Sequence, residues 1–195
     1  MLAKASLYNR IPTEKISYDN WGQTHNLYNK FMQCRIPLEY YNKVNYILVS
    51  ETLCVENKKH LTEKIFKPIV AGKPFILAAG YKNLEYLRSY GFNTFDSLWD
   101  ESYDTVVHPK SRLYRIFRMM KKINLNMLSR YEPGTEKYHQ ELNEFNQKLE
   151  MFEHAHDIAA QNRKYFWSDQ FYNRLINEAI DNLEQAKQEL ASKRV

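Results

Sequence analysis

The chain has 195 residues, 44% hydrophobic and 26% charged, proportions that indicate a folded soluble protein. The net charge of +5 permits contact with a polyanion, whereas the scarcity of glycine and the absence of GxGxxG and GxxxxGK[ST] motifs exclude a glycine-rich phosphate loop. Cys34 and Cys54 lie in no Cys/His cluster, which argues against a zinc site and a disulfide scaffold. Because no apolar run is long enough for a membrane span and no signal peptide is visible, we expect a cytoplasmic protein. We also expect that it needs no metal and no cofactor.

Residues 1–45 are predicted to form an irregular and partly helical extension. The segment is polar and aromatic and has few apolar runs. Leu27, Tyr28, Phe31 and Met32 recur at helical spacing, so we expect a short helix there.

Residues 46–80 have the pattern of a strand, a loop, a helix and a second strand. The first strand, at residues 46–49, is a continuous apolar block, as expected for a parallel strand buried on both faces. A helix then begins after Thr62, whose hydroxyl can cap the first turn, and ends at Gly72. Residues 75–79 form the second strand, so the helix begins at the carboxyl end of the first.

The start of this helix is a candidate phosphate site, because free N–H groups and the helix dipole favour an anion there. Lys64 in the first turn and Lys67 one turn later would supply positive charge, and a protonated His60 can donate to a phosphate oxygen. Glu63 can accept from the paired hydroxyls of a ribose. An ordinary capped helix with a surface Glu-Lys pair explains the same residues. Lys73, beyond the helix, is expected to be exposed.

The remainder of the predicted first domain, residues 1–131, continues the alternation of helix and strand. Residues 83–90 should form a short helix that Gly91 ends, followed by a third strand at residues 92–95 and an acidic helical turn at residues 97–103. This order predicts a small three-layer, Rossmann-like half domain of the α/β class, with a short parallel sheet of about three strands.

A basic amphipathic helix is predicted between residues 105 and 131. The segment contains no Asp or Glu, and its apolar residues recur at steps of three and four. Its basic face is a solvated surface, a wall of the phosphate site or a polyanion contact. The candidate polyanion contacts are Arg112, Arg115, Arg118 and Lys122.

The second predicted unit, residues 132–195, consists of long C-terminal helices. A Glu-Pro-Gly break precedes Thr135, a candidate helix cap, and two apolar stripes flank an aromatic break at residues 165–167. We expect a helical hairpin, or an arm through which two copies of the chain associate. His154 and His156 lie two positions apart and so face different sides of a helix, which argues against a metal pair.

One segment resembles a known family. The run His60-Leu61-Thr62-Glu63-Lys64-Ile65-Phe66, preceded by Val49-Ser50-Glu51-Thr52 and followed by Ala71-Gly72-Lys73-Pro74-Phe75-Ile76, is similar to the donor-binding segment of the α1,3-fucosyltransferases. The segment through Asp104 also resembles short uncharacterised proteins of tailed phages that carry the same Thr-Glu-Lys helix.

The fucosyltransferase resemblance implies a Rossmann-like fold and a glycosyltransferase that moves a sugar from a nucleoside diphosphate to a hydroxyl acceptor. It would place Glu63 on the ribose hydroxyls, Lys64 on the diphosphate and Glu51 near the sugar. The acceptor domain of that family, with its catalytic base, has no room before residue 46. Substitute bases in the N-terminal segment are Asp19, His25 and Glu39.

Three hypotheses follow. The first is a reduced glycosyltransferase that binds a nucleotide sugar and modifies DNA or another phage or host component. The second is a non-catalytic phage protein with a degenerate glycosyltransferase fold, which binds nucleic acid or a protein partner through its basic helix and C-terminal helices. The third is the C-terminal half of a larger enzyme. Each version is expected to act in the cytoplasm, for a phage protein that of the infected bacterium.

Overall fold

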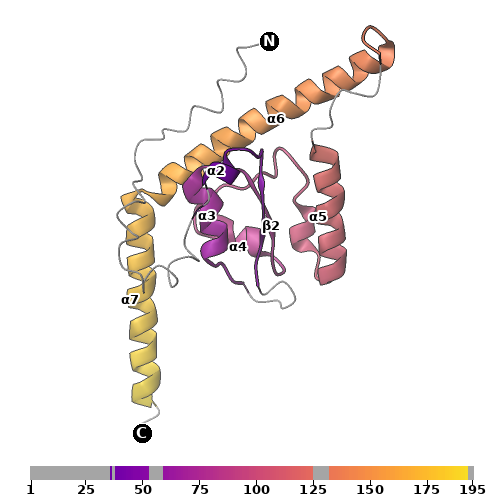
Figure 1. The fold of residues 1–195 in the computed structure, drawn as a ribbon. Helices are drawn as coiled ribbons and strands as arrows, with labels where there is room; N and C mark the ends of the chain where they lie inside the picture. Colours follow the sequence, from indigo (N-terminus) through magenta and orange to yellow (C-terminus); the bar gives the residue numbers. More distant parts are fainter. Residues whose placement is uncertain (1–35, 37, 53–58, 125–131, 193–195) are drawn as a thin grey trace, which may run out of the picture.

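The structure is a computed structural model that describes residues 36, 38–52, 59–124 and 132–192. The short helix expected at residues 27–32 and the candidate bases Asp19 and His25 lie outside these ranges. Figure 1 shows a small α/β unit from which long helices extend. The elements in chain order are α2 (Leu38–Tyr41), β1 (Ile47–Ser50), α3 (Glu63–Ala71), β2 (Phe75–Ala78), α4 (Asn83–Ser89), the 3-10 helix η4 (Ser102–Thr105), α5 (Pro109–Ile123), α6 (Glu136–Phe166) and α7 (Asp169–Ser192).

The described part of the chain contains one sheet, formed by two parallel strands. Val49 of β1 lies opposite Leu77 of β2, and α3 connects the strands, so the predicted strand-helix-strand unit is confirmed. All four residues of β2 are buried. In β1 only Val49 is buried, and Leu48 is 41% exposed. The expected burial of the first strand on both faces is therefore wrong.

The third strand expected at residues 92–95 is absent from the described residues. The N–H of Asn93 donates to the side-chain oxygen of Asn162 in α6, and the amide nitrogen of Asn162 donates to the carbonyl of Asn93, both at 2.8 Å. The N–H of Phe95 donates to the buried carboxylate of Glu101 at 3.0 Å. Side chains thus satisfy backbone groups that a neighbouring strand would otherwise pair.

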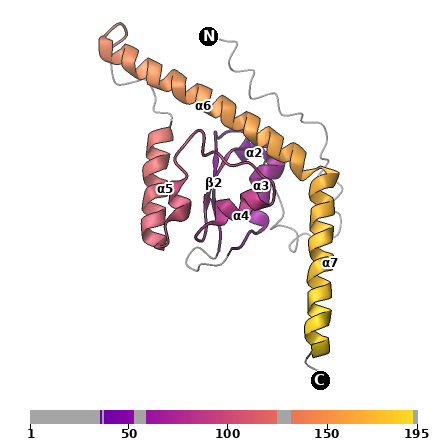
Figure 2. The ribbon, with the colours of Figure 1, turned by 180° about the vertical axis from the view of Figure 1, so that it is seen from behind.

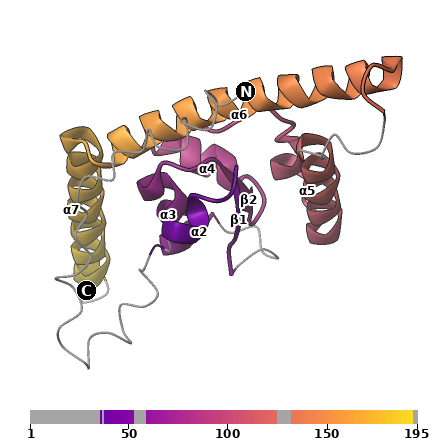
Figure 3. The same cartoon turned by 45° about the horizontal axis from the view of Figure 1, so that its top comes forward.

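Helices cover the sheet on two sides. Figures 1 and 3 show α3 on one side of the strands and α5 on the other, with α6 running across one end of the unit. The predicted α/β class with long C-terminal helices is therefore confirmed, although the protein is mainly helical.

The core is continuous from the sheet into the C-terminal helices. Phe152, Ala155 and Ala159 of α6 belong to the same buried cluster as β2. Phe171, near the start of α7, packs against Phe92 at 5.0 Å between ring centroids, and several other rings surround it. This aromatic cluster consists of Phe66, Phe92, Tyr165, Phe166 and Phe171.

The two long C-terminal helices diverge. Figures 1 and 2 show α6 lying across the α/β unit, whereas α7 turns sharply from the end of α6 and runs along one flank of the unit and beyond it, so the two helices do not lie side by side as in a hairpin. The first half of α6 has no buried residue before Phe152, and α7 buries only Phe171. The first half of α6 and most of α7 therefore lie outside the core.

Candidate functional site

The start of α3 has the predicted cap, but an internal carboxylate lies beside it. Thr62 is extended, and its hydroxyl accepts from the N–H of Lys64 at 3.3 Å. Glu51, which follows β1, is only 2% exposed. Its carboxylate accepts from the N–H of Thr62 at 3.2 Å and from the Thr62 hydroxyl. A carboxylate of the chain thus lies where the helix dipole would favour a phosphate.

The start of α4, after β2, is occupied in the same way. The two oxygens of the Asp104 carboxylate accept from the N–H groups of Leu84 at 3.0 Å and Glu85 at 3.2 Å. Burial raises the pKa of Asp104, and these backbone donors partly offset the rise. Both described helices that follow the strands therefore have an internal acid at their first turn, and a bound phosphate would meet negative charge at each position.

Lys64 is held at the carboxyl end of β1. Its Nζ donates to the hydroxyl of Thr52 at 2.8 Å, and the side chain is partly buried. The structure thus brings Glu51, Thr62 and Lys64 together, as the proposed donor site requires. Glu63, the predicted ribose ligand, is exposed on α3.

The other two predicted donor residues lie near the same edge. The backbone N–H of His60 donates to the side chain of the buried Asn83 at 2.9 Å, and His60 itself is exposed. Lys67 is partly buried on α3, one turn after Lys64. Glu39, the remaining candidate base, is exposed in α2.

Lys73 is buried, contrary to the prediction from sequence. It was expected to be exposed, but it is 2% exposed, and burial lowers its pKa. Its position between the glycine that ends α3 and the buried strand β2 is the signal that could have indicated this. His156 of α6 has a pKa lowered to about 4 by burial and by the charge of Lys73. Lys73, just after α3, and His156 of α6 therefore lie close enough for their charges to interact.

Arg112 is not part of the exposed basic surface. It is 3% exposed, and its guanidinium donates to the carbonyl of Val106 at 2.6 Å and of Val107 at 3.5 Å. These contacts attach the start of α5 to the preceding loop. The expectation that Arg112 contacts a polyanion is therefore wrong.

The outward face of α5 combines cations with aromatic rings. Tyr114 is 64% exposed and Phe117 is 55% exposed, and the guanidinium of Arg118 lies 5.9 Å from the centroid of the Tyr114 ring. The buried face is formed by Arg112, Ile116, Met119 and Ile123. The exposed cations, named here together with Tyr114 and Phe117 as the basic-aromatic face, are Lys110, Arg115, Arg118, Lys121 and Lys122.

The charges of this face are not equivalent. Asp100 lies close enough to Lys122 and Arg115 that their charges help to lower its pKa, although its hydrogen bonds with Ser102 contribute more. Helix α5 itself contains no acidic residue. Tyr114 and Phe117 accompany these cations on the exposed side of the helix.

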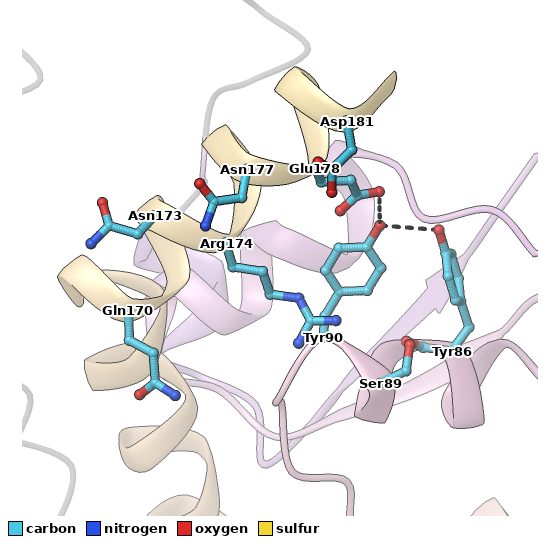
Figure 4. A pocket seen from close by; sticks show the side chains of 9 residues that line it. All are labelled: Tyr86, Ser89, Tyr90, Gln170, Asn173, Arg174, Asn177, Glu178 and Asp181. Atoms are coloured by element: carbon cyan, nitrogen blue, oxygen red, sulfur yellow. Dashed lines mark hydrogen bonds between the residues drawn. The ribbon is translucent and has the colours of Figure 1, made fainter. Parts of the chain in front are cut away.

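An open groove of about 780 Å³ separates α4 from α7. Figure 4 shows that polar side chains of the two helices meet there. The hydroxyl of Tyr90 donates to Glu178 at 2.8 Å, the hydroxyls of Tyr86 and Tyr90 are 3.1 Å apart, and the Arg174 guanidinium lies 4.9 Å from the Tyr90 ring centroid. Burial and these hydrogen bonds raise the pKa of Tyr90. Because these groups bond one another, the groove is mainly a polar contact that holds α7 beside α4.

Comparison with known proteins identifies no relative. No protein-family model, curated protein or solved structure matches the chain. Within the described ranges, no helix is both long and apolar enough to cross a membrane. In the same part of the chain, no group of three or more His, Cys, Asp or Glu side chains could hold a metal ion.

Proposed function

We propose that this protein is a non-catalytic nucleic-acid-binding protein built on a Rossmann-like half domain, and that the basic-aromatic face of α5 is the binding surface. The observation that carries the proposal is the composition of this face. Five cations and two exposed aromatic rings lie on a helix without acidic residues, and the opposite side of the helix is anchored in the core.

The chemistry of the face fits a nucleic acid. Lys and Arg side chains that neutralise phosphates release condensed counterions, which drives association at low salt. Exposed aromatic rings beside these cations offer stacking surfaces for unpaired bases, each worth roughly 1–3 kcal/mol. Tyr114 and Phe117 therefore favour a single strand over a duplex, in which the bases are already stacked.

The carboxylates at the first turns of α3 and α4 favour a binding function over sugar transfer. Glu51 and Asp104 bond the chain where a diphosphate would be held. A donor phosphate there would have to displace or tolerate a carboxylate, at a cost in Coulomb energy. A polyanion bound on α5 meets no acidic residue of that helix, so this cost does not arise there.

The test compares two substitutions that make the same change of charge. Lys121→Glu alters the basic-aromatic face, whereas Lys164→Glu alters an exposed residue near the end of α6. Binding to a labelled single strand and to a duplex of equal length is measured by fluorescence anisotropy at low salt. We expect Lys121→Glu to weaken single-strand binding by roughly tenfold or more and Lys164→Glu to have a much smaller effect. The proposal would be refuted if the wild type bound neither nucleic acid, or if both variants lost the same amount of affinity.

A second candidate function is nucleotide-sugar binding at the carboxyl end of β1. The observation that favours it is the bond from Lys64 to Thr52, which keeps a cation at that edge. The site would comprise Glu51, His60, Thr62, Glu63, Lys64 and Lys67. It predicts that UDP, GDP or a nucleotide sugar raises the melting temperature, that Lys64→Ala removes the rise, and that Lys164→Ala does not. No shift with any of these ligands would leave α5 as the sole candidate.

A further inference from the structure

Helix α7 turns its polar side toward the α/β unit. Figure 4 shows Arg174, Glu178 and Asp181 on the side of α7 that borders the groove with α4. Successive residues of a helix are about 100° apart, so residues 176, 183 and 190 project from the opposite side. That side faces away from the unit.

The outward side of α7 is apolar. Ile176 is 42% exposed, Ile180 is 48% exposed, and Leu183 and Leu190 are 64% and 63% exposed. A surface helix normally has the reverse orientation, with its apolar stripe on the core and its charges in solvent. An exposed apolar stripe of this kind is a candidate surface for association.

The spacing of this stripe is that of a coiled-coil seam. Ile176, Ile180, Leu183, Lys187 and Leu190 follow one another at alternating steps of four and three, which is the a and d pattern of a heptad repeat. The seam from 176 to 190 is about 21 Å long at the rise of an α-helix.

We propose that a second copy of this chain covers the seam, so that two α7 helices pair in a symmetric coiled coil. The seam is self-complementary, because the apolar residues at its a and d positions can serve as both knobs and holes for an identical helix. In this register Ile180 and Lys187 occupy a positions, and Ile176, Leu183 and Leu190 occupy d positions. Ile at a with Leu at d favours two strands, and a single Lys at an a position helps to specify register and oligomeric state. The seam contains one cation, Lys187. Its aliphatic stem can pack on the seam while its ammonium group stays in water, so it needs no acidic partner.

The position of the seam permits this pairing. The α/β unit lies on the polar side of α7, and Figures 1 and 2 show α7 extending away from it. A partner helix on the apolar side therefore places the second α/β unit on the far side of the pair. Helix α5 lies on the opposite side of the α/β unit from α7, so the pairing leaves the basic-aromatic face accessible in each copy.

Sedimentation velocity of the full chain tests the proposal. The matched variants are Leu183→Glu on the seam and Gln185→Glu on the polar side of α7, which carry the same added charge within one helical turn. We expect the wild type and Gln185→Glu to sediment as dimers, and Leu183→Glu to dissociate with a dimer Kd raised roughly 100-fold or more, because two like charges would be buried in an apolar seam.

Thermal melting separates dissociation from misfolding. Because Leu183 is exposed in the single chain, Leu183→Glu should retain helical content and nucleic-acid binding per chain. A wild type that stays monomeric over a wide concentration range would overturn the proposal. A Leu183→Glu variant that dimerises like the wild type would overturn it too.

Discussion

Helices α5 and α7 are both amphipathic, but they present opposite faces to solvent. Helix α5 buries Ile116, Met119 and Ile123 and exposes cations, whereas α7 buries only Phe171 and exposes an apolar stripe. Their apolar periodicity is similar. The difference teaches that periodicity identifies a helix and its stripe, while the rest of the molecule decides whether that stripe belongs to the core or to a partner.

The two helices also differ in how they are attached. Several buried residues along α5 hold it against the sheet, so its exposed face is a fixed surface of the α/β unit. Helix α7 is held at its start by the aromatic cluster and along one side by the polar groove with α4. We therefore expect substitutions at attachment points to change stability, and substitutions on the exposed faces to change binding.

The largest expected effect on stability is that of Phe171→Ala. The ring lies among Phe66, Phe92, Tyr165 and Phe166, and its removal should leave a cavity that lowers the free energy of unfolding by about 3–5 kcal/mol. The matched change on α5, Phe117→Ala, removes a ring that is 55% exposed and should cost less than about 1 kcal/mol. Urea denaturation of both variants measures this contrast. Similar losses would contradict the claim that α7 is anchored through Phe171.

A second contrast lies within α5. Arg112→Met leaves the carbonyls of Val106 and Val107 without the donors of Arg112, and should lower the free energy of unfolding by about 1.5–3 kcal/mol. Arg118→Met should leave stability within about 0.5 kcal/mol of the wild type but weaken nucleic-acid binding. Chemical denaturation and anisotropy separate the two roles. If both variants lost only binding, Arg112 would belong to the exposed surface after all.

The pattern of basic residues could not separate these two arginines. The sequence correctly predicted the elements that depend on local signals, such as the Thr62 and Thr135 caps and the glycine that ends α3. It failed where distant residues decide. Asn162 lies 69 positions from Asn93, yet its side chain bonds the backbone of the segment expected to be a third strand.

The free energy of unfolding should depend on pH, because His156 of α6 is packed near Lys73. Burial, the Lys73 charge and a smaller opposing effect of Asp157 leave His156 with a pKa of about 4, against 6.5 for an unperturbed side chain. Between these values the unfolded chain binds more protons, so stability falls as pH is lowered from 6.5 to about 4. After allowance for partial exposure, we expect His156 to account for about 2 kcal/mol of this loss.

His156→Gln should remove that part of the pH dependence, and His154→Gln, at an exposed site two residues away, should not. Urea midpoints measured across this pH range provide the comparison. Parallel pH curves for the wild type and His156→Gln would show that the imidazole is not buried against Lys73.

The smallest expected effect concerns the start of α3. Thr62→Ala removes the cap on Lys64 and one donor to Glu51, and should lower stability by about 1 kcal/mol. Thermal unfolding measures this loss, with Thr105→Ala as the control at an exposed position. An effect below that of the control would mean that the Glu51-Thr62 contact does not stabilise the helix.

The candidate donor site was only partly predictable from sequence. The capping residue and the proximity of Lys64 to the end of β1 follow from the order of strand, loop and helix. The carboxylates that occupy the starts of α3 and α4 do not, because Glu51 and Asp104 are separated from those helices in sequence by 11 and 20 residues. The general rule that a helix start binds an anion thus holds here, but the anion is supplied by the chain itself.

The salt dependence of single-strand binding tests the central claim most directly. Binding constants of the wild type and of Arg118→Ala are measured over a series of salt concentrations, and the logarithm of each constant is plotted against the logarithm of salt concentration. If the basic-aromatic face holds the phosphates, affinity falls steeply with salt and the slope for Arg118→Ala is smaller in magnitude by about 0.7. A wild type that does not bind, or equal slopes for the two proteins, would contradict the account.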